Sequence, residues 1–259
     1  MIPKIIHYCW FSNDEKPRYI KRCINSWKKK MPEYKVICWD PNSFDFNSIP
    51  YTREAYRLKK WAFVADYIRF YALYKYGGIY LDSDIKVLKP LDSFLNADFF
   101  VGTEAFYDEN QKLIGINPDA AQFGSCANNP ILKECMEYYE NNEFIIPAEG
   151  ITNILTSPAL LGKVLQKYGY IYKDEYQKLK NNTIIYPNNI LSNIYSYNNL
   201  NIKPFTIHHL ANSWMSDTKR GVIYRFCKNY NIMSIYHIIE QITRKKINLH
   251  FNKQKLNNK

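Results

Sequence analysis

Two aspartates separated by one residue, Asp82 and Asp84, are the first residues in this sequence that could do chemistry. They follow the apolar run at residues 79–81 and precede a second apolar run, which places them at the end of a buried strand. Two carboxylates desolvated side by side are unstable unless a positive partner neutralises them. Oxygen donors of this kind suit Mn²⁺ or Mg²⁺, which also bind the phosphate oxygens of a substrate. The pair therefore predicts a divalent-cation site at the edge of a cleft.

The surroundings of the two aspartates favour a site over a solvated turn, which is the alternative interpretation of any isolated DxD. In an extended chain, residues i and i+2 point to the same side, so both carboxylates are expected to converge. Open α/β sheets bind ligands at the carboxyl ends of their strands. The preceding helix carries Asp66 and Arg69 three positions apart in an otherwise apolar stretch. An ordinary helical ion pair explains these two residues as well as a binding role does.

The elements that must position these residues follow from the periodicity of the sequence. Strand patterns at residues 2–10 and 34–40 flank a helical pattern within 16–32, an order that predicts a parallel α/β sheet. The clearest helix spans residues 51–76, with Thr52 as its cap and Gly77 and Gly78 as its end. Weaker patterns predict strands at 98–106, 183–186 and within 205–214, and helices near 130–139 and 151–168.

Histidines near the end of the chain could complete a metal site. His208 and His209 lie in the late strand pattern, and only one of two neighbours in a strand can face a cleft. We prefer His208 as a metal ligand or diphosphate contact, while a core histidine bonded to backbone is the alternative. His7 lies between apolar strand residues, Ile5 and Cys9, and is expected to be structural.

Four segments of the sequence resemble a known family. IPKIIHYCWFS, SWKKKMPEYKVICWD, AYRLKKWAFVADYIRFYALYKYGGIYLDSDIKVLKPL and IHHLANSW look like the DxD-containing sugar-binding region of the OCH1-like and capsular polysaccharide glycosyltransferases, glycosyltransferase family 32. The large clostridial glucosylating toxins are more distant relatives. The resemblance implies an α/β fold of the GT-A type, a Rossmann-like nucleotide-sugar-binding fold, and transfer with retention at the anomeric carbon.

The resemblance also implies roles for individual residues. Asp84 would be the main metal ligand, and Asp82 would contact the metal shell and the ribose. Asp66 and Arg69 would bind hydroxyls of the donor sugar, and Trp10 would stack on the base. Tyr80 would also belong to the donor site. Ser213 and Trp214 would form the closing motif that reaches the diphosphate. Together with the metal, Trp214 would stabilise the leaving diphosphate.

Two positions in the middle of the chain leave the mechanism open. Glu104 could be a nucleophile, but a contact with the acceptor or a role at the strand end is the preferred interpretation. We assign no catalytic base. In LTSPAL, Ser157 stands where the family often has the glycine of a T-G-P segment, and residues 108–186 otherwise match the family loosely. This is the region where the acceptor would bind.

Bulk composition bounds the class of protein. The 259 residues are 46% hydrophobic and 16% aromatic, which excludes a disordered chain. The six cysteines form no CxxC pair, the first residues are not a signal peptide, and no window approaches about 18 consecutive apolar residues. We therefore expect reduced thiols in a cytoplasmic protein.

The positive charge is concentrated at the end of the chain. Most of the net charge of +11 lies from Lys219 onward, where Glu240 is the only acidic residue. This divides the chain into a GT-A domain, residues 1–218, and a basic amphipathic helical tail or annex, residues 219–259. Such a tail could attract an anionic membrane surface, placing the protein at the inner face of the cell membrane. A solvated helical face explains the basic residues of the tail nearly as well. Nucleic-acid binding is the weakest explanation, because the sequence has no nucleic-acid-binding motif.

Three functions remain open at this point. The preferred one is a metal-dependent hexosyltransferase that moves sugar from a nucleotide-sugar, with UDP-sugar favoured, to a glycan or lipid-linked acceptor in surface (capsular) polysaccharide synthesis. A phosphatase of the haloacid-dehalogenase type also has a DxD after an apolar strand, but there the motif follows the first strand, and DSDIKVLKP lacks the residues that should come next. A nucleotide-sugar-binding protein without turnover is the third candidate.

Overall fold

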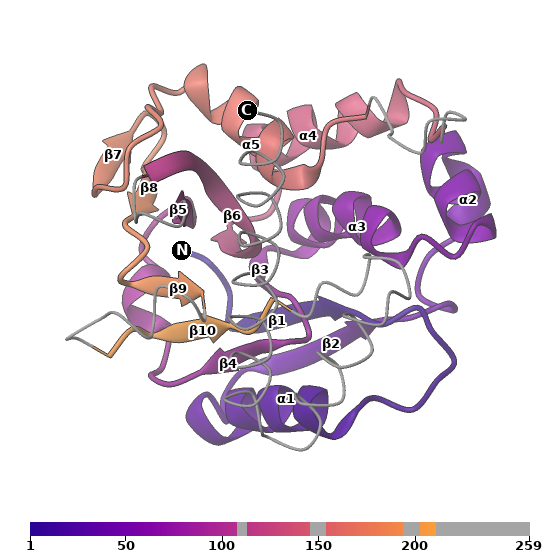
Figure 1. Cartoon of the computed structure of the whole chain (residues 1–259), viewed down its shortest axis with the longest axis horizontal. Helices are drawn as coiled ribbons and strands as arrows, with labels where there is room; N and C mark the ends of the chain where they lie inside the picture. The colour runs from indigo at the N-terminus through magenta and orange to yellow at the C-terminus, as the bar shows by residue number, and fades with distance from the viewer. Residues whose placement is uncertain (108–112, 146–153, 194–202, 211–259) are drawn as a thin grey trace, which may run out of the picture. The chain divides into compact units, whose positions relative to one another are not determined.

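The computed structural model describes residues 1–107, 113–145, 154–193 and 203–210 (Figure 1). The chain divides into two compact units, Met1–Glu15 with Ile20–Leu210, and Lys16–Tyr19 with Ala211–Lys259. The sheets and the candidate site belong to the first unit. The predicted boundary at residue 218 and the predicted tail lie outside the described residues.

Two sheets form the framework of the larger unit. The first has seven strands in the order β2 (Lys35–Trp39), β1 (Ile5–Cys9), β3 (Gly78–Leu81), β6 (Leu113–Ser125), β5 (Phe99–Tyr107), β8 (Thr183–Tyr186) and β7 (Gln177–Leu179). The second has the order β4 (Ile85–Val87), β10 (Thr206–His208) and β9 (Leu191–Asn193). The chain passes from the first sheet to the second between β3 and β4, at the DxD.

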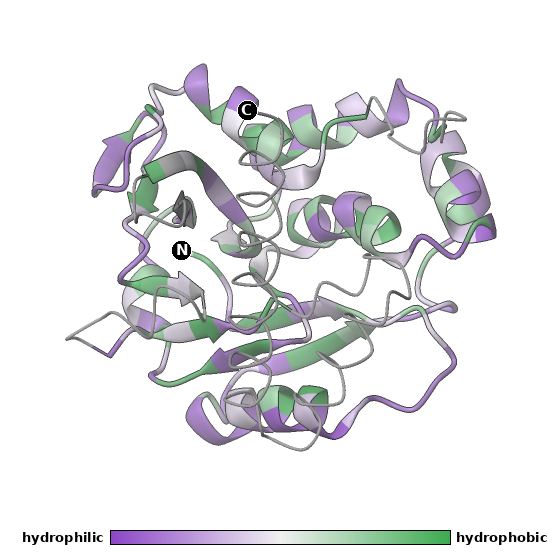
Figure 2. Ribbon diagram, viewed as in Figure 1, coloured by the Kyte–Doolittle hydropathy of each residue, from purple (hydrophilic) through white to green (hydrophobic). Residues whose placement is uncertain are grey.

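The first strands form the parallel α/β arrangement that the sequence predicts. β1 pairs in parallel with both β2 and β3, and α1 (Arg18–Lys30) connects β1 to β2. Helix α1 buries one apolar face that includes Ile20 and Trp27, and Trp27 Nε1 donates a hydrogen bond to the Ile85 carbonyl at 2.7 Å. Figure 2 shows mostly hydrophobic residues along β1 and β2. The predicted α/β fold class is confirmed.

The predicted helix over residues 51–76 is two helices, α2 (Pro50–Arg57) and α3 (Trp61–Tyr76). They are separated at Lys59, whose φ of 54° is left-handed and cannot continue a helix. Thr52 is not a cap, because the N-cap position is Ile49. Thr52 Oγ1 instead donates to the carbonyls of Phe46 and Ile49, at 2.9 and 3.0 Å. Here the predicted cap and the predicted single helix are wrong.

The two glycines end α3 as predicted and turn the chain into β3. Gly77 has φ 63°, and its N–H donates to the Leu73 carbonyl at 2.8 Å. Gly78 has φ 115°, and a Cβ there would lie 2.6 Å from the Ile5 carbonyl oxygen. Glycine at this position therefore lets β3 approach β1 closely enough to pair.

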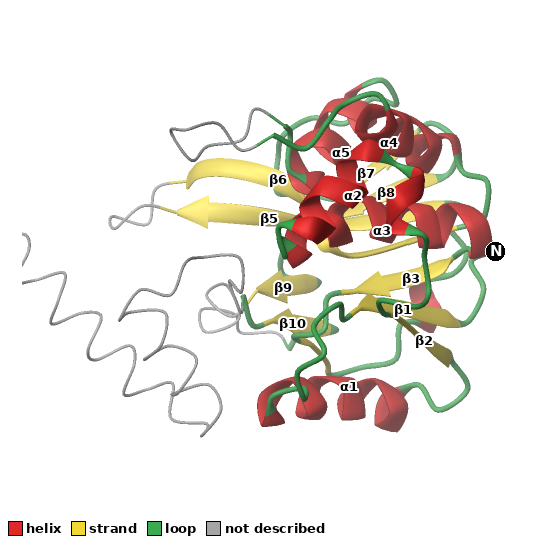
Figure 3. Cartoon of the chain, turned by 90° about the vertical axis from the view of Figure 1, so that its right-hand side faces the viewer, coloured by secondary structure: helices red, strands yellow, loops and turns green. Residues whose placement is uncertain are grey.

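Strand β6 is the longest strand that the sequence analysis missed; it also missed the short strands β7 and β9. Its sequence, LIGINPDAAQFGS, contains glycine, proline and aspartate, all of which are rare in strands. It pairs with β5 along most of its length, and Figure 3 shows both strands running beyond their neighbours. The register jumps from Val101↔Phe123 to Thr103↔Pro118, so residues 119–122 form a bulge opposite β5.

The remaining helices cover the sheet on the side of α3. The predicted helices near 130–139 and 151–168 correspond to α4 (Pro130–Glu140) and the shorter α5 (Ser157–Gln166), and two short 3₁₀ helices occur at Phe46–Ser48 and Asp92–Phe94. Helix α4 contacts both α3 and α5, and α5 contacts β6. Across the described ranges, no helix combines the length and apolarity needed to cross a bilayer.

Candidate functional site

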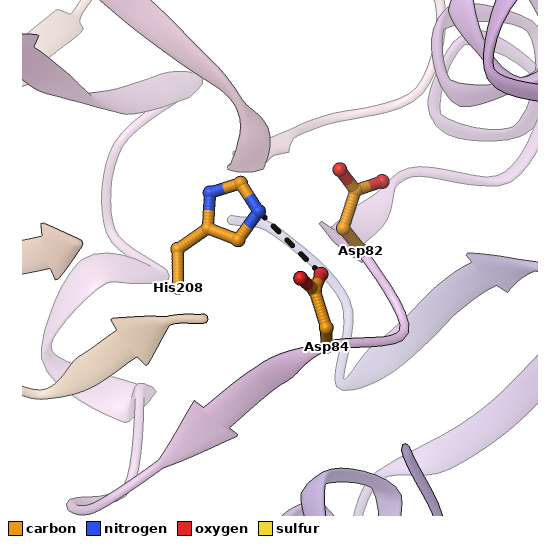
Figure 4. A group of neighbouring side chains, drawn as sticks. All are labelled: Asp82, Asp84 and His208. Atoms are coloured by element: carbon orange, nitrogen blue, oxygen red, sulfur yellow. Dashed lines mark ion pairs between the residues drawn. The ribbon is translucent and has the colours of Figure 1, made fainter. Parts of the chain in front are cut away.

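Three side chains that could hold a metal ion lie together where the two sheets meet. Asp82 follows β3, Asp84 precedes β4, and His208 is the last residue of β10. One ligand atom from each lies within 4.8 Å of the other two, and Figure 4 shows the side chains pointing toward one another. His208 Nε2 is 3.4 Å from Asp84 Oδ1. The structure therefore groups the predicted ligands, and the histidine in the group is His208.

The two carboxylates converge for a different reason from the predicted one. Residues 82–84 are not extended, because the Ile85 N–H donates to the Asp82 carbonyl at 2.9 Å and closes a turn. This turn directs the chain into β4, which pairs antiparallel with β10 so that Ile85 lies opposite His208. The argument from alternation along a strand is wrong here. The turn and the second sheet bring the three ligands together.

The electrostatics of this cluster favour a cation. Burial lowers the pKa of His208, but the charge and hydrogen bond of Asp84, with Asp119 and Asp82, outweigh it and raise that pKa to about 10. His208 Nδ1 is buried and has no hydrogen-bond partner in the described residues. Burial also raises the pKa of Asp82, against the charges of Arg69 and His208. Two carboxylates and one imidazole are a donor set that fits Mn²⁺.

Helix α3 contributes a buried arginine that joins two aspartates. Arg69 Nη2 lies 3.2 Å from Asp66 Oδ1 and 3.7 Å from Asp82 Oδ1. Tyr80 donates its hydroxyl to Asp82 Oδ1 at 2.9 Å, and the Arg69 guanidinium lies over the Tyr80 ring, 4.9 Å from its centre. Because Asp66 and Arg69 are both buried and tied to the DxD, they are more than an ordinary helical ion pair.

The bulge in β6 supports this arrangement through its backbone. The Ala120 carbonyl accepts a 2.7 Å hydrogen bond from Arg69 Nη1. The next carbonyl, that of Ala121, accepts one from the Asp82 N–H at 2.8 Å. Two successive bulge residues therefore fix both the arginine of α3 and the first aspartate of the DxD.

Side chains of the same bulge reach toward β10. Asp119 accepts hydrogen bonds from the Ala121 N–H at 3.1 Å and from Gln122 Nε2 at 2.7 Å. Gln122 Oε1 in turn accepts a hydrogen bond from Thr206 Oγ1, two residues before His208. The sequence analysis missed these residues, and the one local signal for them is a short polar and small-residue stretch inside a strand.

The other predicted donor residues take different positions. Trp10 follows β1, and because β1 and β3 are parallel it lies at the same sheet edge as the DxD; its Nε1 donates to the Asp14 carbonyl at 3.1 Å. Tyr80 is 1% exposed and reaches the site through Asp82. Ser213 and Trp214 lie outside the described residues.

Glu104 lies on β5 near the cluster. Burial, then the charge of Asp119 and more weakly that of Asp82, raise the pKa of its carboxyl to about 7, although His208 opposes them. A carboxyl with this pKa exchanges its proton near neutrality. The structure thus gives Glu104 a carboxyl that can gain or lose a proton near neutral pH.

His7 is a structural residue, as predicted. Trp39 donates its Nε1–H to His7 Nδ1 at 3.1 Å, so Nε2 carries the proton and donates to the Gly77 carbonyl at 3.0 Å. Burial lowers the pKa of His7 to about 4, against the effect of the Gly77 hydrogen bond. A neutral histidine therefore connects β1, β2 and the glycine turn.

Residues 17–101 match the family described as "Glycosyltransferase sugar-binding region containing DXD motif". The matched span contains Asp66, Arg69, Asp82 and Asp84. Over these residues the chain is similar to the DXD glycosyltransferases, and the resemblance predicted from the sequence is confirmed for this span.

The relatives carry related names. Inositol phosphoceramide mannosyltransferase 3 of Schizosaccharomyces pombe is 32% identical over 111 residues, covering 37% of this chain and 28% of the relative. Inositol phosphoceramide mannosyltransferase 2 of the same organism is 30% identical over 176 residues, covering 65% and 47%. The chain thus spans less than half the length of these relatives. Among solved structures, the PaToxG glycosyltransferase has a TM-score of 0.48 and 19% identity, covering 64% of this chain and 69% of that one.

Proposed function

We propose that this protein is a metal-dependent glycosyltransferase that moves a sugar from a nucleotide-sugar to a saccharide or lipid-linked acceptor. One observation carries the proposal: the ligand atoms of Asp82, Asp84 and His208 lie within 4.8 Å of one another, beside the buried Asp66–Arg69 pair. Asp82, Asp84 and His208 would hold Mn²⁺ or Mg²⁺, which supplies charge to stabilise a leaving diphosphate. The match of residues 17–101 to the DXD family supports the same function.

The residues around the cluster have separate tasks in this proposal. Asp66 and Arg69 bind donor-sugar hydroxyls, because they offer an acceptor and donors in a fixed, buried arrangement next to the DxD. Trp10 stacks on the base at the same sheet edge. The reaction proceeds with retention, and the acceptor attacks from the face that the diphosphate leaves, so no strongly basic protein nucleophile is required.

The identity of the sugar is a finer part of the proposal. The names of the relatives favour a mannosyl donor. Stacking on Trp10 favours a donor that carries UDP. Some members of the family that this sequence resembles use guanosine donors, which favours GDP instead. A lipid-linked or polysaccharide acceptor at the inner face of the membrane fits the basic residues from Lys219 onward.

The first experiment measures the melting temperature of the purified protein with UDP or GDP, each with Mn²⁺ or with EDTA. A ligand at about a hundred times its Kd adds ~2.7 kcal/mol of stability, which is easily measured. A rise that requires both a nucleotide and the metal supports the proposal and identifies the base. Nucleotide-sugars that carry the identified base then test turnover, which is measured as release of the sugar in the absence of an acceptor.

The competing functions predict different results. A phosphatase would release phosphate from a monoester and gain nothing from a nucleoside diphosphate. A binding protein without turnover would show the metal-dependent rise but no sugar release. No rise with either nucleotide would overturn the proposal.

A further inference from the structure

The carboxylate of Asp66 is held by a residue far away in the sequence. Ser157, the first residue of α5, donates its hydroxyl to Asp66 Oδ1 at 2.7 Å across a separation of 91 positions. Its main chain also forms a hydrogen bond with this carboxylate. Ser157 is 1% exposed, so water does not compete for this contact.

Ser157 and Arg69 act on the same oxygen of Asp66. Arg69 Nη2 lies 3.2 Å from Asp66 Oδ1, the oxygen that also accepts the Ser157 hydroxyl. A hydroxyl and a guanidinium together restrict the carboxylate to one orientation, because rotation would break both contacts. A residue without a side-chain hydroxyl at position 157 would leave this contact unmade.

The Ser157 contact acts on Asp66 and Arg69, the two residues that bind the donor sugar in the proposed function. Ser157 bonds to Asp66, which pairs with Arg69, and Arg69 in turn lies near Asp82; among the described residues no hydrogen bond joins Ser157 to His208. A loss of the hydroxyl should therefore disturb the groups that face the sugar and leave the metal ligands in place.

We propose that Ser157 is a positioning residue that orients Asp66 toward the hydroxyls of the donor sugar, so that it governs recognition of the sugar but not of the nucleotide. This inference rests on the proposed function. Ser157 itself need not touch the substrate, because its effect passes through Asp66.

The test compares Ser157→Ala and Ser157→Thr with the wild-type protein, using full-length chains. The control is Ser125→Ala. Ser125 is also fully buried, but its hydroxyl donates to the backbone carbonyls of Asp98 and Cys126. It lies at the end of β6 that pairs with the start of β3. For each variant, we would measure the Kd of UDP and GDP with Mn²⁺, and kcat and KM for nucleotide-sugars that differ in one sugar hydroxyl.

The alanine variant should keep its Kd for the nucleoside diphosphate within about twofold, while kcat/KM for the nucleotide-sugar falls about tenfold to a hundredfold, the range for one hydrogen bond to a charged group. Its preference between epimeric sugars should also weaken. Ser157→Thr retains the hydroxyl and should restore most of the activity, and the control should change neither quantity.

Three outcomes separate the claims. If Ser157→Ala lowers only the unfolding midpoint and leaves kcat/KM and sugar preference unchanged, Ser157 is merely structural and the inference is wrong. If the alanine variant weakens UDP or GDP binding as much as it weakens nucleotide-sugar use, the effect is not specific to the sugar and the inference is also wrong. If the wild-type protein neither binds a nucleotide nor releases sugar, the proposed function itself fails.

Discussion

The guanidinium of Arg69 lies 3.7 Å from Asp82 Oδ1 and so joins helix α3 to the metal-binding turn. Arg69→Met should leave the buried Asp66 and the partly buried Asp82 without their cation. Because an unpaired buried charge is costly, we expect a loss of about 3–5 kcal/mol in the free energy of unfolding, measured in urea. Arg57→Met is the matched control, since Arg57 forms an exposed pair with Glu54 and its loss should change the free energy of unfolding far less. Equal losses in the two variants would contradict the role of Arg69.

Asp84→Asn should abolish the metal-dependent rise in melting temperature with nucleotide. The substitution removes the charge of one of the three clustered ligands while keeping the shape of the side chain. Asp40→Asn is the control, because Asp40 directly follows β2 at the same sheet edge but is not part of the cluster, and it should keep the full rise. A rise that survives in Asp84→Asn would show that the metal binds elsewhere.

His7 should make the protein sensitive to acid. Its folded-state pKa of about 4 is below the usual value of 6.5, so the unfolded chain binds the proton more readily. The stability that His7 contributes is present above pH 6.5 and is lost as the pH falls toward 4, by up to about 3 kcal/mol. His7→Gln cannot titrate, so its unfolding free energy in urea should fall less between pH 7 and pH 4.5 than that of the wild type. Identical falls would refute the buried neutral state.

Gly78→Ala should destabilise the junction between α3 and β3. Its Cβ would lie 2.6 Å from the Ile5 carbonyl oxygen, so β1 and β3 would have to separate. Gly169→Ala is a matched control: Gly169 also has a positive φ, 105°, but an added Cβ would have no atom within 4 Å. We expect about 1–2 kcal/mol of backbone strain in the control and a clearly larger loss in Gly78→Ala, with weakened metal binding.

Glu104→Gln tests whether this carboxyl is a nucleophile. If Glu104 contacts the acceptor, as we expect, the variant should still release sugar from the donor when no acceptor is present. Transfer to the acceptor should fall at least tenfold, which is the lower end of the usual contribution of a hydrogen bond to a charged group. A nucleophile would behave differently, because both reactions would need it. Loss of both activities, with the nucleotide Kd unchanged, would therefore favour the nucleophilic role.

Local patterns in the sequence determined several strands, one helix end and the role of His7. The apolar run before Asp82 predicts strand β3, and Gly77 and Gly78 predict the end of α3, because each depends on a few neighbouring residues. The alternation around His7 predicts both the strand and a structural histidine. The strand–helix–strand order predicts the parallel pairing of β1 and β2. In each case the signal is local: an apolar run, a pair of glycines or an order of short patterns along a few neighbouring residues.

Tertiary structure decided the geometry of the site. The turn at Asp82, the bulge in β6 and the bond from Ser157 to Asp66 depend on contacts between residues far apart in the chain. The carbonyls of Ala120 and Ala121 act through backbone atoms that every residue possesses. Residue types along the sequence therefore carry no signal for them. The sequence determined which chemical groups are present, and the packing of α3, α5 and β6 determined which of them meet, because a hydrogen bond depends on position in space and not on spacing along the chain.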